Sequence, residues 1–115
     1  KTAMENFSVL KRNNTYVCPT LVTWHNFLNP DLPYENNKVL QNLTEEITGF
    51  WKNMIDGFRK KDNDYKQMAL KKYENLKKVT YLLYKSGVQI LTGSDAMNPY
   101  CIPGYSLHTE LEILK

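Results

Sequence analysis

The sequence predicts an α/β fold, namely part of a (β/α)8 TIM barrel in which a pair of helices joins two neighbouring parallel strands. Two short apolar runs, "TYVCPTLV" and "VQILTG", are typical of strands buried on both faces. Two long amphipathic stretches separate them, as expected for a crossover between parallel strands. Gly87 joins the second stretch directly to the second strand, which is the usual link from helix to strand in α/β proteins.

The chain has 115 residues, which is enough for one small domain, and 42% of them are hydrophobic. Its net charge of +3 comes from a Lys-rich segment that Asp and Glu interrupt, so no continuous basic stripe for nucleic acid is present. No apolar run approaches the roughly 20 residues that cross a bilayer. We therefore expect neither a nucleic acid nor a membrane as partner. The compartment of the parent protein stays open, with a cytoplasmic location favoured.

The first half of the chain is predicted to hold a helix, a strand, a loop and a second helix. Apolar residues at helical spacing indicate a helix over residues 2–12. The strand covers residues 15–20, because Pro19 lacks a donor and fits only near its end. "NFLNPDLPYENN" is a loop by its prolines and Asn/Asp residues, and an apolar stripe then indicates a helix over 43–60, started by Asn42 or Thr44.

The second half is predicted to continue with a helix, a strand and a final helix. The helix covers residues 64–86 and ends at Gly87, where a left-handed backbone is cheap. The strand follows at 88–94, and Ser106 is expected to cap a last helix over 106–115. Two buried strands alone do not form a stable open sheet. We therefore expect the chain to be a single segment of a larger domain and helix-rich when isolated.

Asp95 is the main candidate for chemistry, because it follows the second predicted strand in "ILTGSDA". Active sites of (β/α)8 barrels lie at the C-terminal ends of their strands. A carboxylate placed there can bind a divalent metal, accept a proton from water, or do both. The alternative is that Asp95 only caps a turn by bonding to neighbouring amides.

Several short motifs together resemble the amidohydrolase superfamily, in particular its imidazolonepropionase-like and Xaa-Pro dipeptidase-like members. They are Gly87-Val88, "GSDA" from Gly93, Pro103-Gly104, and "LHTEL" from Leu107, in the order and spacing typical of that family. "PTL" in "VCPTLV" also occurs in its preceding strand. The resemblance implies the seventh and eighth strands of the family's barrel, at the C-terminal part of its catalytic domain.

The resemblance also implies a metal-dependent hydrolase that cleaves a C–N bond in a cyclic or dipeptide-like amide, with zinc as the usual metal. Asp95 would be a metal ligand and the general base. The family's other ligands, including a His-x-His pair, have no counterpart in this chain. We therefore expect the chain alone to bind no metal and to be inactive, whereas the parent protein is an enzyme that acts on a small amide substrate.

Four further residues are candidates for substrate contact, each with a structural alternative. They are His25, Tyr100, Tyr105 and His108. His25 follows the first strand in the chain, where loops at the top of such barrels line sites, although a plain loop histidine is the competing interpretation. Loop packing explains the two tyrosines equally well, and His108 is interpreted as structural. Glu110 is placed in the first turn of the last helix, and Trp51 in the packing of the crossover.

The cysteines and the state of the isolated chain lead to two other expectations. Cys18 and Cys101 lie far apart without metal-ligand spacing, and they are expected to be reduced, with a disulfide between them as the alternative. The alternative to the hydrolase is a self-standing helical module that binds a protein partner without catalysis. An isolated fragment is expected to cover its unpaired strand edges by forming a homodimer, since its native partner is the rest of the barrel.

Overall fold

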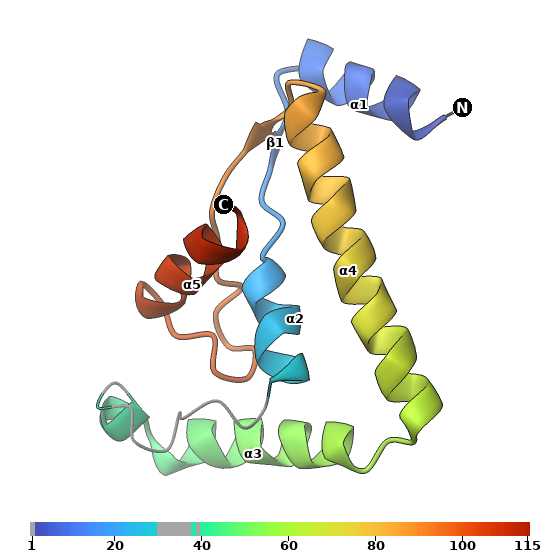
Figure 1. The fold of residues 1–115 in the computed structure, drawn as a ribbon. Helices are drawn as coiled ribbons and strands as arrows, with labels where there is room; N and C mark the ends of the chain where they lie inside the picture. Colours follow the sequence, from blue (N-terminus) through green and yellow to red (C-terminus); the bar gives the residue numbers. More distant parts are fainter. Residues whose placement is uncertain (1, 30–37, 39) are drawn as a thin grey trace.

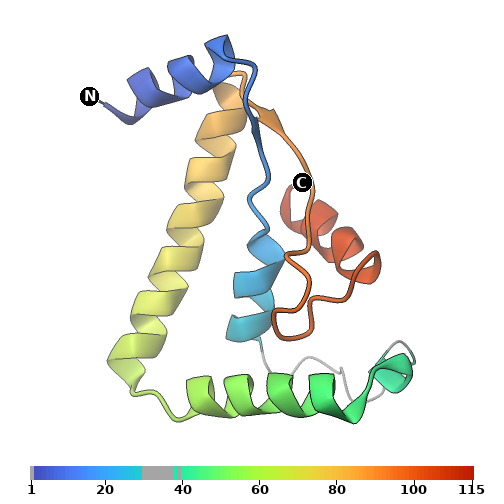
Figure 2. The same cartoon turned by 180° about the vertical axis from the view of Figure 1, so that it is seen from behind.

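The computed structural model describes residues 2–29, 38 and 40–115 and shows a helix-rich chain with one small sheet (Figure 1). The elements in chain order are α1 (Ala3–Arg12), β1 (Tyr16–Val17), α2 (Leu21–Leu28), a 3-10 turn (Leu40–Asn42), α3 (Glu45–Arg59), α4 (Asn63–Lys85), β2 (Gln89–Ile90) and α5 (Tyr105–Ile113). The long helix α4 forms one side of an open frame. α3 lies across its N-terminal end and α1 across its C-terminal end (Figures 1 and 2).

The prediction of a partial (β/α)8 TIM barrel with its seventh and eighth strands is wrong. The sheet of the described chain has two strands of two residues each, and helices make up most of the rest. β1 and β2 are parallel, with Tyr16 opposite Gln89 and Val17 opposite Ile90. The sequence indicated strands over 15–20 and 88–94, but the pairing ends far sooner on both.

The chain leaves the sheet early because of the residues that follow β1. Pro19 has no N–H to donate, and Thr20 has a left-handed backbone with φ of 47°. The last hydrogen bond of the pair runs from the N–H of Leu91 to the carbonyl of Val17, at 2.8 Å. Beyond it the two segments stay close: a Cβ on Gly93 would collide with the sulfur of Cys18. Only glycine fits at that position without a shift.

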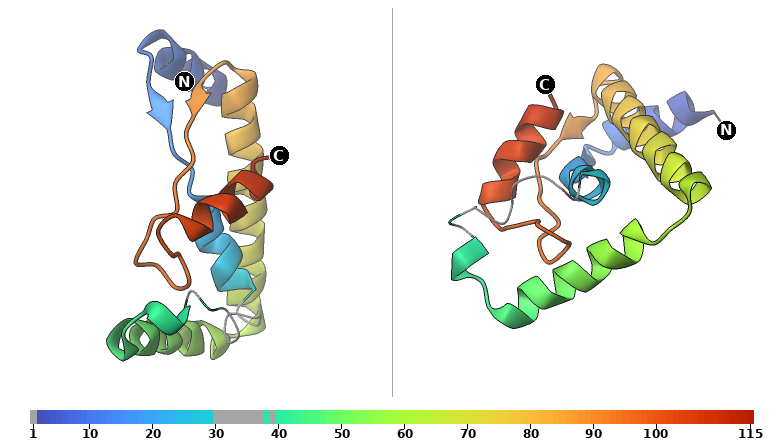
Figure 3. Two further views of the ribbon diagram at one scale, coloured as in Figure 1. Left: turned by 90° about the vertical axis from the view of Figure 1, so that its left-hand side faces the viewer. Right: turned by 60° about the horizontal axis from the view of Figure 1, so that its bottom comes forward.

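Helix α2 was not predicted. It begins directly after Thr20 and uses the apolar residues that the sequence assigned to the end of a strand, together with the first residues of the predicted loop. Residues 30–37 of that loop lie outside the described residues. Leu21, Val22 and Asn26 are buried, since α2 lies between α4 and α5 (Figure 3, right). Its position makes it the centre of the molecule.

The two crossover helices begin at side-chain caps. The hydroxyl of Thr44 accepts the N–H of Ile47 at the start of α3, and the carboxylate of Asp62 accepts the N–H of Tyr65 at the start of α4. α4 ends where expected, with Gly87 in the left-handed region at φ of 81°. Of the described crossover elements, α4 contacts α2 extensively, whereas α3 has no comparably extensive contact with another described element.

The main apolar cluster lies where α1 crosses the C-terminal end of α4. Its buried members are Phe7, Leu83 and Val88, with Leu10, Val17 and Ile90 packed against them. The fold as a whole is open: its radius of gyration is 16.0 Å, against about 13 Å for a compact domain of this length. Among the described residues, no helix combines the length and the apolar character needed to cross a membrane.

Candidate functional site

Asp95 lies in the loop between β2 and α5, and its side chain is exposed. Its backbone is left-handed, with φ of 45°. The carboxylate accepts a hydrogen bond from the side-chain amide of Asn98 at 2.8 Å, and its backbone carbonyl accepts the N–H of Asn98 at 3.3 Å. The turn is therefore closed by the backbone and by the Asn98 side chain. The Asp95 carboxylate itself accepts no backbone amide among the described residues.

The loop from Asp95 to Tyr100, which we call the aspartate loop, is held in an unusual backbone conformation. Asp95, Met97 and Tyr100 all have positive φ, at 45°, 88° and 60°, although none of them is glycine. Each such residue costs on the order of 1–3 kcal/mol and persists only where its surroundings impose the conformation. Three of them within six residues mean that neighbouring elements must fix this loop.

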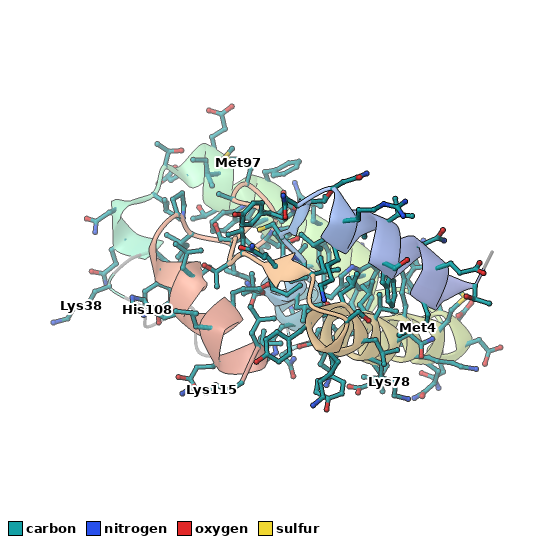
Figure 4. The ribbon with its side chains drawn as sticks, turned by 90° about the horizontal axis from the view of Figure 1, so that it is seen from above. Met4, Lys38, Lys78, Met97, His108 and Lys115 are labelled. Atoms are coloured by element: carbon teal, nitrogen blue, oxygen red, sulfur yellow. The ribbon has the colours of Figure 1, made fainter. Side chains whose placement is uncertain are left out.

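Three elements supply these contacts. From α3, the indole N–H of Trp51 donates to the carbonyl of Met97 at 3.0 Å. From α2, the amide of Asn26 donates to the carbonyl of Pro99 at 3.5 Å. From α5, the hydroxyl of Ser106 donates to the carbonyl of Tyr100 at 3.2 Å. These side chains thus bind the carbonyls of three residues of the aspartate loop. Figure 4 shows Met97 of this loop beside α3.

Two polar side chains of α2, Asn26 and Thr23, contact the buried thiol of Cys101, the residue that follows the aspartate loop. The thiol of Cys101, which is 0% exposed, lies 3.6 Å from the amide of Asn26 and 3.8 Å from the hydroxyl of Thr23. Burial is the largest effect on this thiol and raises its pKa, so it stays protonated and unreactive. Cys18 is exposed, and the two cysteines are not joined by a disulfide.

Glu110 joins α5 to the start of α2. Sequence analysis placed it in the first turn of its own helix, but α5 begins at Tyr105, and Glu110 caps α2 instead. Thr20 gives α2 no side-chain cap, and the Oε2 atom of Glu110 accepts the N–H of Val22 at 2.7 Å. The carboxylate is 0% exposed, and its Oε1 atom has no hydrogen-bond partner among the described residues.

The charge of Glu110 is opposed by burial and favoured by the backbone. Burial is the larger effect, and it raises the pKa of Glu110 above its ordinary value of 4.5. The N–H of Val22 pulls the pKa down, and those of Leu21 and Thr20 do so more weakly. A carboxylate at a helix N-terminus is favourable for the helix dipole, so the arrangement is a cap supplied by a residue 88 positions away.

Ser106 does not cap α5 as predicted. The residue before that helix is Gly104, with φ of 76°, and it provides no side-chain cap. The hydroxyl of Ser106 instead accepts the N–H of Ile102 at 2.8 Å while it donates to Tyr100. Ser106 therefore shapes the end of the loop rather than the start of the helix.

The other predicted site residues lie in different places. His25 is half-buried on α2, with its ring centroid 6.5 Å from that of Tyr73 on α4; burial first, then the charge of Lys77, lowers its pKa. Tyr105 and His108 are exposed on α5, and Figure 4 shows His108 well away from Met97. Tyr100 belongs to the aspartate loop. Its ring meets that of Trp51 edge-on, with centroids 5.7 Å apart.

The residues around Asp95 do not form a metal site by themselves. Within the part of the chain that the structure describes, no three His, Cys, Asp or Glu side chains lie close enough together to hold an ion. Asp95 is a single carboxylate next to an amide, whereas catalytic zinc takes three protein ligands. Any metal would therefore need ligands beyond those gathered here.

Comparison with known proteins gives no relative. No family model, no curated protein and no solved structure matches the chain.

Proposed function

We propose that this chain is the part of a metal-dependent amidohydrolase that carries the catalytic aspartate, Asp95. The observation that supports it is the presentation of Asp95 itself. Its carboxylate is exposed beyond the end of a parallel strand, on a loop whose strained backbone is fixed by contacts from three helices. Strain of this kind is concentrated at functional sites. The motifs "GSDA" and "LHTEL" add support by their resemblance to the family.

The role proposed for Asp95 is proton transfer during hydrolysis of a C–N bond. Its carboxylate accepts the proton of the attacking water and then delivers it to the leaving nitrogen, so the group ends the cycle as it began. The substrate is a small cyclic or dipeptide-like amide. The described residues offer no ligand set for a metal, so the proposal requires metal ligands from beyond them.

The test is the Asp95→Asn substitution in the full-length protein that contains this segment, with turnover of cyclic amides and dipeptides as the readout. We expect kcat to fall at least a hundredfold while the melting temperature is unchanged. Asp64→Asn, an exposed aspartate in the first turn of α4, is the matched control and leaves kcat unchanged. Full activity in the Asp95 variant overturns the proposal.

A second candidate function, a helical module that binds a protein, is favoured by a different observation. The chain exposes 8064 Å² of surface, against about 6,500 Å² for a compact monomer of its mass. Exposed apolar side chains contribute to this excess on both crossover helices: Phe50 on α3, and Val79, Tyr81, Leu82 and Tyr84 on α4. The predicted α3 stripe is mostly unburied, since Trp51 and Ile55 are its buried members.

The flanking coding sequence separates the two functions. A His-x-His pair upstream in the same reading frame favours the hydrolase, whereas genuine chain ends at Lys1 and Lys115 favour the module. Light scattering on the isolated chain tests the expected homodimer, and a compact monomer contradicts it.

A further inference from the structure

We infer that Trp51 is a positioning residue for Asp95, and that the crossover helix α3 holds the aspartate loop through the indole N–H of this side chain. For its catalytic consequence the inference rests on the proposed function. Its structural content, a clamp between α3 and the loop, stands independently of any activity.

Trp51 is buried and makes one specific polar contact. The side chain is 2% exposed, on a helix where most apolar residues remain accessible. A buried indole needs an acceptor for its N–H, and this one donates to the carbonyl of Met97 at 3.0 Å, across 46 residues of chain. Trp51 therefore ties α3 to one defined backbone atom of the loop.

The carbonyl that Trp51 binds belongs to Met97, in the most strained part of the loop. Met97 has φ of 88°, a value that a residue with a side chain rarely adopts. Its side chain is 63% exposed, so packing of that side chain does not hold the backbone in place. The hydrogen bond from Trp51 acts on the peptide two residues after Asp95, where rotation would redirect the carboxylate.

The Trp51 ring also contacts Tyr100 at the other end of the aspartate loop. Its edge-to-face contact with Tyr100 fixes a second residue with positive φ, at 60°. One side chain thus engages the loop at Met97 through its N–H and at Tyr100 through its ring. Asn26 and Ser106 hold the carbonyls of Pro99 and Tyr100, which leaves the Met97 peptide to Trp51.

Hydrogen exchange on the 115-residue chain tests the clamp. The variant is Trp51→Phe, which keeps an aromatic ring and removes the donor. The N–H groups of Asn98 and Cys101, which bond to the carbonyls of Asp95 and Asn98 within the loop, report its opening. We expect their exchange to become about tenfold faster, the effect of losing one hydrogen bond. The N–H of Leu91, bonded to Val17 between the strands, is the internal control and stays protected.

Two further variants separate the N–H from the ring and from general destabilisation. Benzothienylalanine at position 51 has the size of tryptophan and lacks the N–H, so it should reproduce the faster exchange. Trp24→Phe is the matched control, since that ring lies under the ammonium of Lys72 at 4.6 Å, and it should leave loop exchange unchanged. Unchanged exchange at Asn98 and Cys101 in both Trp51 variants overturns the clamp.

The catalytic consequence is measured in the full-length protein. Trp51→Phe should lower kcat about tenfold with little change in KM, because the substrate still binds while the carboxylate is less often in place. A wild-type kcat in this variant overturns the positioning role if Asp95→Asn abolishes turnover. If Asp95→Asn has no effect, the proposed function falls, and the exchange data alone decide whether Trp51 clamps the loop.

Discussion

The two ends of the parallel strand pair are held by different forces. Where α1 meets the C-terminal end of α4, Phe7, Leu83 and Val88 form an apolar cluster. At the other end, where the strands run into α2 and the aspartate loop, the buried groups include Asn26, Ser106 and Glu110. Apolar burial is strong and non-directional, whereas buried polar groups are costly unless each is bonded. We infer that the apolar end supplies stability and the polar end supplies a defined geometry.

The largest effect is expected from Leu83→Ala at the apolar end. Leu83 is 7% exposed and packs in the cluster that holds α1, so its truncation leaves a cavity there. The free energy of unfolding should fall by about 3 kcal/mol. Urea denaturation monitored by circular dichroism measures it, with Leu70→Ala on the exposed face of α4 as control. A loss no greater than that of the control contradicts the assignment of stability to this end.

A smaller loss is expected at the polar end from Glu110→Ala. The variant leaves the N–H of Val22 without its acceptor, and a buried unpaired donor costs about 1–3 kcal/mol. Glu110→Gln keeps an acceptor oxygen and removes the charge, so it should cost less than about 1 kcal/mol. Urea denaturation of both variants compares their free energies of unfolding. Equal losses in the two variants would show that the charge, and not the cap, is what matters.

The smallest effect is the dependence of stability on pH through Glu110. Because its folded pKa is raised above the ordinary 4.5, its contribution is fully present below pH 4.5 and is lost as the pH rises through the folded value. The wild type should therefore gain stability relative to Glu110→Gln as the pH falls from 7 toward 4.5. His25, whose lowered pKa acts in the opposite sense, is present in both proteins and cancels. A constant difference contradicts the raised pKa.

Local signals in the sequence locate most helices but not the contacts that join them. Amphipathic spacing and Gly87 suffice for the extent of α3 and α4, because these signals act within a few residues. Helix α2 is missed because its start is fixed by Glu110, far away in the chain, and not by a cap in its own sequence. An apolar run after Pro19 reads equally well as a strand end or as a buried helix.

The candidate site is predictable in part for the same reason. Asp95 stands out by its place after a strand, and its exposure and strained backbone keep it the main candidate. The roles of Trp51 and Asn26 could not be predicted, since each depends on a loop carbonyl that sequence patterns do not position. A tryptophan in the apolar stripe of its helix was the available signal, and the sequence assigned it to packing. His25 faces α4 instead of the loop because it lies on the unpredicted helix.

The two cysteines differ in exposure, so their reaction with a thiol reagent can report opening of the aspartate loop. Cys18 is exposed, so in the native protein it is the thiol that a water-soluble alkylating reagent reaches. Cys101 is buried next to the aspartate loop, against Thr23 and Asn26 of α2, and is modified only when the loop separates from α2. The ratio of the alkylation rate of Cys101 to that of Cys18 in the same molecule therefore reports the fraction of molecules in which the loop is open.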